Sequence, residues 1–157
     1  MNLPAAFRGV VAVAVLYPLY PTPLPVERPD APQAGLLIAK LQAGGRLITA
    51  QLALTPEQQQ KGLMFRRSMR QDEGMLFVYK EPAVKCFWMK NTFLPLTVAF
   101  VASDGSIASL ADMEPESTRS SCSNQPVRFV LEMNRGWFDR HACKVGCRLN
   151  GRLFGGA

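Results

Sequence analysis

The fold of this chain is restricted most by a series of short β-capable segments separated by turn sequences. The clearest pair is LTVAFVA at 96–102 and SIASLADM at 106–113, joined by Ser-Asp-Gly, which is typical of a hairpin turn. LLIAKLQ and RLITAQLAL flank Ala-Gly-Gly at 43–45 and predict a second hairpin. Further strands are predicted at 75–80, 86–90, 127–134 and 147–154. Repeated short strands favour a sandwich or barrel over a parallel α/β sheet.

Two short helices are expected between these strands. Thr55, Pro56 and Gln58 stand in the order of a capping box, so a helix begins there and runs to about residue 63. A second helix is predicted over 136–143, and the Ser-rich segment 114–126 is predicted to be a long loop. The sequence therefore predicts a mainly β, single compact antiparallel β-barrel or sandwich-like domain with two short helices.

The segment VRFVLEMN at 127–134 has the alternation of a strand with one buried face. Val127, Phe129, Leu131 and Met133 are predicted to point inward. The opposite face is predicted to be polar because it carries Arg128 and Glu132, with Val130 as the one interruption.

Length and charge restrict the number of domains and the partners. A chain of 157 residues accommodates one domain and not comfortably two. The net charge of +6 is spread along the chain, without a Lys/Arg-rich run or the motif of a nucleic-acid reader. We therefore expect no nucleic-acid partner.

The N-terminal sequence predicts export. Arg8 precedes the apolar run GVVAVAVL, which is the layout of a secretory signal over residues 1–20. Prolines from Pro18 onward close the run before it reaches the ~20 residues of a membrane span. A Pro-rich linker is predicted at 21–35 and the β domain at 36–157. The expected location is periplasmic or otherwise exported. Because no small-x-small cleavage site follows the run, an uncleaved N-terminal anchor is the alternative, and it would be the only contact with a membrane.

Four segments stand in a fixed order: KGLMFR at 61–66, GMLFVY at 74–79, FWMKNTFLPL at 87–96 and VLEMNRGWF at 130–138. Together they resemble the DUF192 family, a family of unknown function, and the resemblance covers about residues 36–153. It implies a small β-rich barrel or sandwich domain, often exported, without an assigned activity.

The resemblance also implies a disulfide. A subset of the family carries cysteine before the FWMKNT-like strand and again in the polar loop, at the positions of Cys86 and Cys122. Cys143 and Cys147 depart from the family pattern. With His141 beside them they could form a metal site, a local disulfide or two buried thiols, and the sequence leaves these three alternatives open.

A binding or accessory module is the favoured functional hypothesis. Trp88 and its aromatic and polar neighbours in FWMKNT have the composition of a small-ligand pocket. The candidate ligand-binding residues are Arg66, Trp88, Lys90, Asn91, Asp112, Glu132 and Asn134. The structural alternative is that Asn91 and Thr92 form a turn, that Trp88 fills the core, and that Glu132 pairs with Arg66 or Lys90.

Two other functions are alternatives to a binding module: an enzyme and a copper-handling protein. An enzyme could use Lys90, Glu132 and Arg66, because lysine is tuned by burial and a carboxylate serves as a base. His141 is the single histidine and has no evident nucleophile, so no catalytic residue is assigned. A periplasmic copper-handling protein could use the soft ligands Met64, Met69, Met75, Met89, Met113 and Met133, although core packing explains their scatter better. No cofactor and no metal-ligand set are predicted, and the partner would be a small molecule or a protein.

Overall fold

The computed structural model describes residues 30–154. The predicted export segment and residues 21–29 of the predicted linker lie outside the described residues. The mainly β prediction with two short helices is confirmed. The ten elements are β1 (Ile38–Ala43), β2 (Arg46–Ala53), α1 (Pro56–Lys61), β3 (Glu73–Ala83), β4 (Cys86–Phe87), β5 (Leu96–Val101), β6 (Ile107–Met113), β7 (Ser121–Cys122), β8 (Val127–Asn134) and α2 (Trp137–Arg140).

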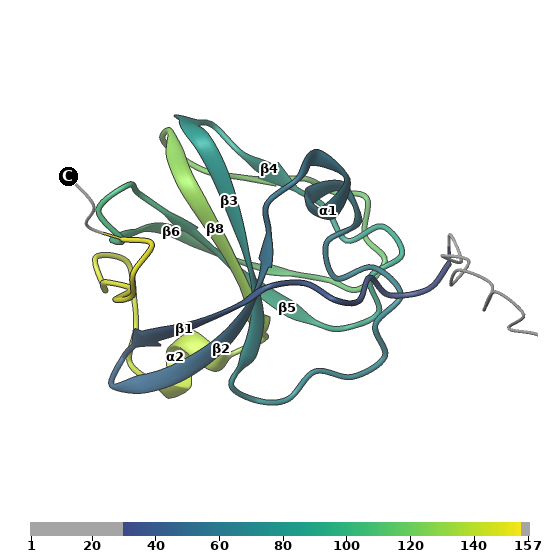
Figure 1. The fold of residues 1–157 in the computed structure, drawn as a ribbon, viewed down its shortest axis with the longest axis horizontal. Coiled ribbons are helices and arrows are strands. Elements are labelled where there is room, and N and C mark those ends of the chain that lie inside the picture. Colours follow the sequence, from purple (N-terminus) through teal and green to yellow (C-terminus); the bar gives the residue numbers. More distant parts are fainter. Residues whose placement is uncertain (1–29, 155–157) are drawn as a thin grey trace, which may run out of the picture.

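Six strands form one sheet in the order β1-β2-β3-β8-β5-β6 (Figure 1). The strands β4 and β7 form a separate pair. The two predicted hairpins are present as β1–β2 and β5–β6. The expectation of a purely antiparallel sheet is corrected at one place, where β2 and β3 pair in parallel. The connection between them contains α1 and returns the chain to the end of the sheet at which β2 begins, as parallel pairing requires.

The sheet is buried on both faces, and this corrects the prediction of a polar face on β8. One hydrophobic cluster contains Phe129, Leu131 and Met133 of β8 together with residues of α2. The other contains Val130 and every second residue of β5 from Leu96 to Phe100. All six residues of β5 are therefore buried. The predicted alternation holds from Phe129 to Met133, but Val127 lies in the same cluster as Val130. The second face is covered by the turn after α1 and by the loops around β4.

The predicted last strand over 147–154 is wrong. This segment makes only isolated bridges, one between Gln42 and Asn150 and one between Ser106 and Arg148. It thereby hydrogen-bonds to both outer strands, β1 and the start of β6, at one end of the sheet. The sheet is not closed into a barrel. A disulfide between Cys143 and Cys147 fixes the chain just before this segment, which selects the local-disulfide alternative.

The capping box predicted at Thr55 is present. The Thr55 side chain accepts a hydrogen bond from the backbone N–H of Gln58, and the Gln58 side chain accepts one from the backbone N–H of Thr55. Gln59 then donates from its side chain to the carbonyl groups of Ala53 and Val78. These contacts fix α1 against the end of β2 and the middle of β3.

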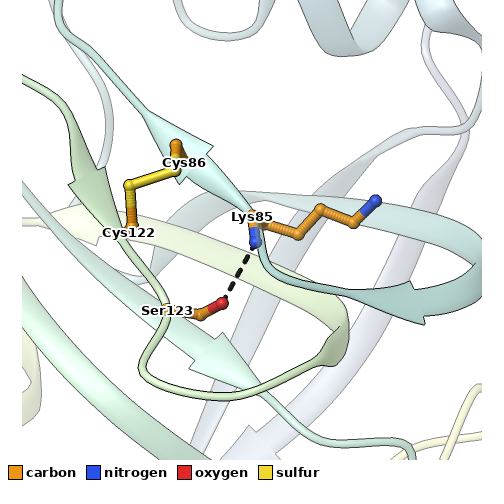
Figure 2. The surroundings of a disulfide bond; sticks show 4 residues. All are labelled: Lys85, Cys86, Cys122 and Ser123. Carbon is orange, nitrogen blue, oxygen red and sulfur yellow. Dashed lines mark hydrogen bonds between the residues drawn. A yellow bond between two sulfur atoms is a disulfide. The ribbon is translucent and has the colours of Figure 1, made fainter.

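The disulfide implied by the family resemblance is also present, between Cys86 and Cys122 (Figure 2). The two cysteines face each other directly across the β4–β7 pair. Next to them, the backbone N–H of Lys85 donates to the Ser123 hydroxyl group at 3.0 Å, and the backbone N–H of Ser123 donates to the Lys85 carbonyl group. The loop that follows FWMKNT is thus fastened to β4 by one covalent bond and two hydrogen bonds.

Candidate functional site

A pocket of about 200 Å³ lies where α1 and the turn after it approach β3 and β4. It is lined by residues 59–64, 77, 79, 86–88, 92 and 132. Each of the four segments that carry the family resemblance contributes to this lining: KGLMFR through Lys61, GMLFVY through Tyr79, FWMKNT through Trp88, and VLEMN through Glu132. Segments that lie up to 71 residues apart in the sequence therefore meet at one pocket.

Two tight turns hold the first and third of these segments together. The backbone N–H of Phe65 donates to the carbonyl oxygen of Asn91 at 2.7 Å. Both residues have positive φ, 65° for Phe65 and 55° for Asn91. Asparagine adopts this conformation readily, but it is unusual for phenylalanine, and such backbone is concentrated at functional sites. Gly62 also has a positive φ of 48°, and a Cβ there would lie 3.3 Å from the Phe77 ring, so the turn approaches β3 closely only because of glycine.

The walls of the pocket are largely aromatic. The Phe77 and Phe87 rings pack edge to face with centroids 4.7 Å apart. Trp88 forms part of the rim and is 50% exposed, so it does not fill the core. The buried Thr92 and the disulfide-bonded Cys86 complete this side.

Glu132 is the one carboxyl side chain among the described residues that line this pocket. It is 4% exposed and lies between Met75 of β3 and Val98 of β5 in the sheet register. No hydrogen bond or ion pair is formed by its carboxyl group within the described residues, so neither Arg66 nor Lys90 neutralises it. Burial raises the pKa of Glu132 to about 8, because the charged form has lost its water. At neutral pH this side chain is therefore mostly a carboxylic acid, which donates as well as accepts hydrogen bonds.

Tyr79 supplies a second titratable group on the same wall. Burial and, to a smaller extent, the nearby Glu132 charge raise the pKa of the Tyr79 phenol to about 12. Tyr79 therefore presents a neutral hydroxyl group to the pocket at any physiological pH.

The structure places three of the predicted site residues away from this pocket. The Arg66 side chain donates to Gln51 on β2, and the cost of burial lowers its pKa. Asp112 accepts a hydrogen bond from the Thr97 hydroxyl group at 2.5 Å and lines other hollows of the surface. Asn134 donates to the carbonyl groups of Met69 and Arg70 and thus holds the segment before β3.

Lys90 and Asn91 lie beside the pocket but do not line it. The Lys90 ammonium group is exposed, 5.8 Å from the centroid of the Trp88 ring. Asn91 contributes to the turn through its backbone, because it has a positive φ and its carbonyl oxygen accepts a hydrogen bond from the Phe65 N–H. Of the seven predicted residues, Trp88 and Glu132 line the pocket.

Sequence reasoning missed Lys61, Phe77, Tyr79 and the glutamines of α1 as lining residues. The signal was available for the first three, because they lie inside the KGLMFR and GMLFVY segments that carry the resemblance. The glutamines had no such signal, since only the crossover through α1 brings them to β3.

The described residues hold no group of three or more His, Cys, Asp and Glu side chains arranged to bind a metal ion. The methionines considered as soft ligands are divided between the two faces of the sheet: Met133 lies in one hydrophobic cluster, and Met75, Met89 and Met113 lie in the other. Neither helix within residues 30–154 is long and apolar enough to cross a membrane.

Comparison with family models matches residues 39–151 to DUF192, described as an uncharacterized ACR. The chain belongs to the DUF192 family. Among solved structures, this DUF192 domain is similar to a protein of Sinorhizobium meliloti 1021 described as a "putative transcription regulator". The identity is 38%, the match covers 78% of this chain and 99% of that one, and the TM-score is 0.74.

It is also similar to a protein of unknown function from Novosphingobium aromaticivorans DSM 12444, with 32% identity, 78% and 94% coverage, and a TM-score of 0.72. Among curated proteins, none matches the chain. The two disulfides of this DUF192 member are typical of an oxidising, extracellular-type environment.

Proposed function

We propose that this chain is an exported binding module that takes a small molecule into the pocket between α1, β3 and β4. The observation that carries the proposal is the convergence of all four family segments on that pocket, whose lining includes the buried Glu132 carboxyl group. Within residues 30–154 no side chain forms an ion pair with this group. Natural proteins leave few buried polar groups without a partner, so such a group in a pocket lining calls for an explanation, and a bound ligand would supply one.

The composition of the pocket supports recognition more than hydrolysis. Aromatic walls with a few polar groups are usual for ligand sites. Glycoside hydrolysis, by contrast, ordinarily uses two carboxyl groups on either side of the substrate. Within the described lining, Glu132 has no second carboxyl group or histidine beside it.

Export is supported by the two disulfides and by the signal-like layout of residues 1–20. Intact mass spectrometry of the full chain recovered from the periplasmic fraction tests this part. We expect a protein with four oxidised cysteines. A chain found only in the cytosol with free thiols would contradict export.

Native mass spectrometry of the same preparation tests the binding function. We expect a retained small molecule in the wild-type protein and in Phe93→Ala, which removes an aromatic ring outside this pocket. Trp88→Ala, which removes part of the rim, should lose the molecule. Equal retention by both variants would place the ligand elsewhere and would reject this pocket as the site.

A further inference from the structure

Three lysine side chains lie in the wall of the pocket or against its aromatic rings. Lys61 lines the pocket at the end of α1. The Lys85 ammonium group lies 3.8 Å from the centroid of the Tyr79 ring, and the Lys90 ammonium group lies 5.8 Å from that of Trp88. Both rings belong to the pocket wall. None of the three lysines has an ion-pair partner among the described residues.

The interior of the pocket does not balance this charge at neutral pH, because its one carboxyl group is buried among apolar side chains and holds its proton. A protonated carboxyl group on an apolar wall is a hydrogen-bond donor, and a ligand oxygen satisfies it. The three lysines, which form no ion pair with any described residue, add an attraction for negative charge. The lysines would repel a cationic ligand.

We propose that the pocket binds small organic carboxylates, with a ligand oxygen accepting the O–H of Glu132 and the ligand charge facing Lys61. This inference rests on the proposed function and specifies its ligand class. A pocket of about 200 Å³ accommodates a molecule of the size of benzoate.

The other charged or titratable groups on this side of the sheet do not explain a change of binding near pH 8. Tyr79 of β3 titrates well above the range of interest, because burial raises its pKa to about 12. Lys61 comes from α1, and Arg66, on the turn after it, is held by Gln51. β5 contributes only apolar side chains to this face. The pH dependence of binding near pH 8 therefore belongs to Glu132.

Three probes of nearly equal size test the inference: benzoate, benzamide and benzylammonium. Binding to the full chain is followed by NMR of the Met64 methyl group, which lies in the pocket wall. We expect benzoate to bind most tightly at pH 6.5 and to weaken about tenfold by pH 9, as the donor form of Glu132 is lost. Glu132→Gln keeps a neutral donor at this position, so its benzoate affinity should persist and lose the pH dependence.

The contribution of lysine charge to binding is tested with two variants that make the same charge change at different places. Lys61→Gln should weaken benzoate binding several-fold, on the order of three- to tenfold. Lys144→Gln makes the same charge change on an exposed loop away from the pocket and should leave the affinity unchanged.

Tightest binding by benzylammonium, strengthening with pH and lost in Glu132→Gln, would overturn the carboxylate inference and leave small-molecule binding intact. Failure of all three probes to shift Met64 would also overturn it, and the native mass spectrum would then decide the proposed function separately. A pH dependence of benzoate binding that persists in Glu132→Gln would equally reject the role of Glu132.

Discussion

Glu132 pairs in register with Met75 on one side and Val98 on the other, and its carboxyl group has lost nearly all contact with water. Removal of water from an ionisable group costs far more free energy in the charged form than in the neutral form. Since the pKa of Glu132 rises from 4.5 to about 8, the native protein takes up a proton that the unfolded chain does not hold between these pH values.

The first prediction concerns stability against pH. The free energy of unfolding of the wild-type protein should fall as pH rises from about 4.5 through 8 and then level off, because the native state holds the extra proton in that window. Glu132→Gln removes the effect, so it should be the more stable protein at pH 9, by several kcal/mol at ~1.4 kcal/mol per pKa unit. Chemical denaturation at a series of pH values measures the difference. Glu81→Gln, at an exposed site, is the control, and a wild-type curve parallel to that of Glu132→Gln would contradict the prediction.

The second prediction concerns Asn91. Its positive φ of 55° is sufficient to explain why an asparagine stands at this position, so no contact with a ligand is needed for that explanation. Asn91→Gly should leave stability nearly unchanged, whereas Asn91→Ala should cost about 1 kcal/mol, because alanine resists the left-handed conformation. Urea midpoints of the three proteins measure this. If Asn91→Gly kept its stability but lost the pocket ligand, the side chain would have a binding role that the structure does not assign to it.

At the scale of elements, β4 and β7 are only two residues each and depend on the Cys86–Cys122 disulfide between them. A pair of this length has too few backbone hydrogen bonds to persist alone in water. The disulfide therefore holds the Cys86–Trp88 side of the pocket against the rest of the domain.

The third prediction compares the two disulfides. Their cysteines are 36 and 4 residues apart, so their removal should cost about 4 and about 2 kcal/mol in the chain-entropy model. Paired Cys→Ala variants, unfolded in guanidinium chloride, measure both values. A larger loss from Cys143→Ala/Cys147→Ala would show that native contacts of the C-terminal segment outweigh loop entropy.

Local sequence signals were sufficient for the elements they control. The capping residues at Thr55, the Ser-Asp-Gly turn and the alternation along β8 each act over a few residues, and each predicted element is present. The parallel pairing of β2 with β3 was not predictable in this way, because it depends on where the crossover through α1 places the chain. The same crossover brings Lys61 to the pocket that Glu132 lines. Trp88 and Glu132 were predicted from their residue types, whereas Lys61 and Tyr79 were marked only by their place in the family segments.

In the whole molecule, the central strands β3, β8 and β5 are paired on both sides, and β1 and β6 are the outer strands. The C-terminal segment hydrogen-bonds to both outer strands at one end, through Gln42 and Ile107. Stability should therefore be lowest along the parts of the outer strands beyond these contacts.

The fourth prediction follows for hydrogen exchange. Backbone amides of β3, β5 and β8 should exchange most slowly, and those of Gln42 and Ile107 should be better protected than other amides of the outer strands. Exchange measured by NMR after removal of the Cys143–Cys147 disulfide should accelerate at these two amides and leave β8 unchanged. Uniform acceleration over the whole sheet would instead indicate that the molecule opens as one unit.

The position of β8 also determines when the sheet can be completed during synthesis of the chain. β8 lies between β3 and β5, which do not pair with each other, so residues 127–134 join two otherwise separate pieces of sheet. A nascent chain that has emerged only as far as β6 has β1–β2–β3 on one side and the β5–β6 hairpin on the other, without the strand that connects them. The domain therefore completes its sheet late, only after residues 127–134 have left the ribosome, and until then the facing edges of β3 and β5 lack their partner strand.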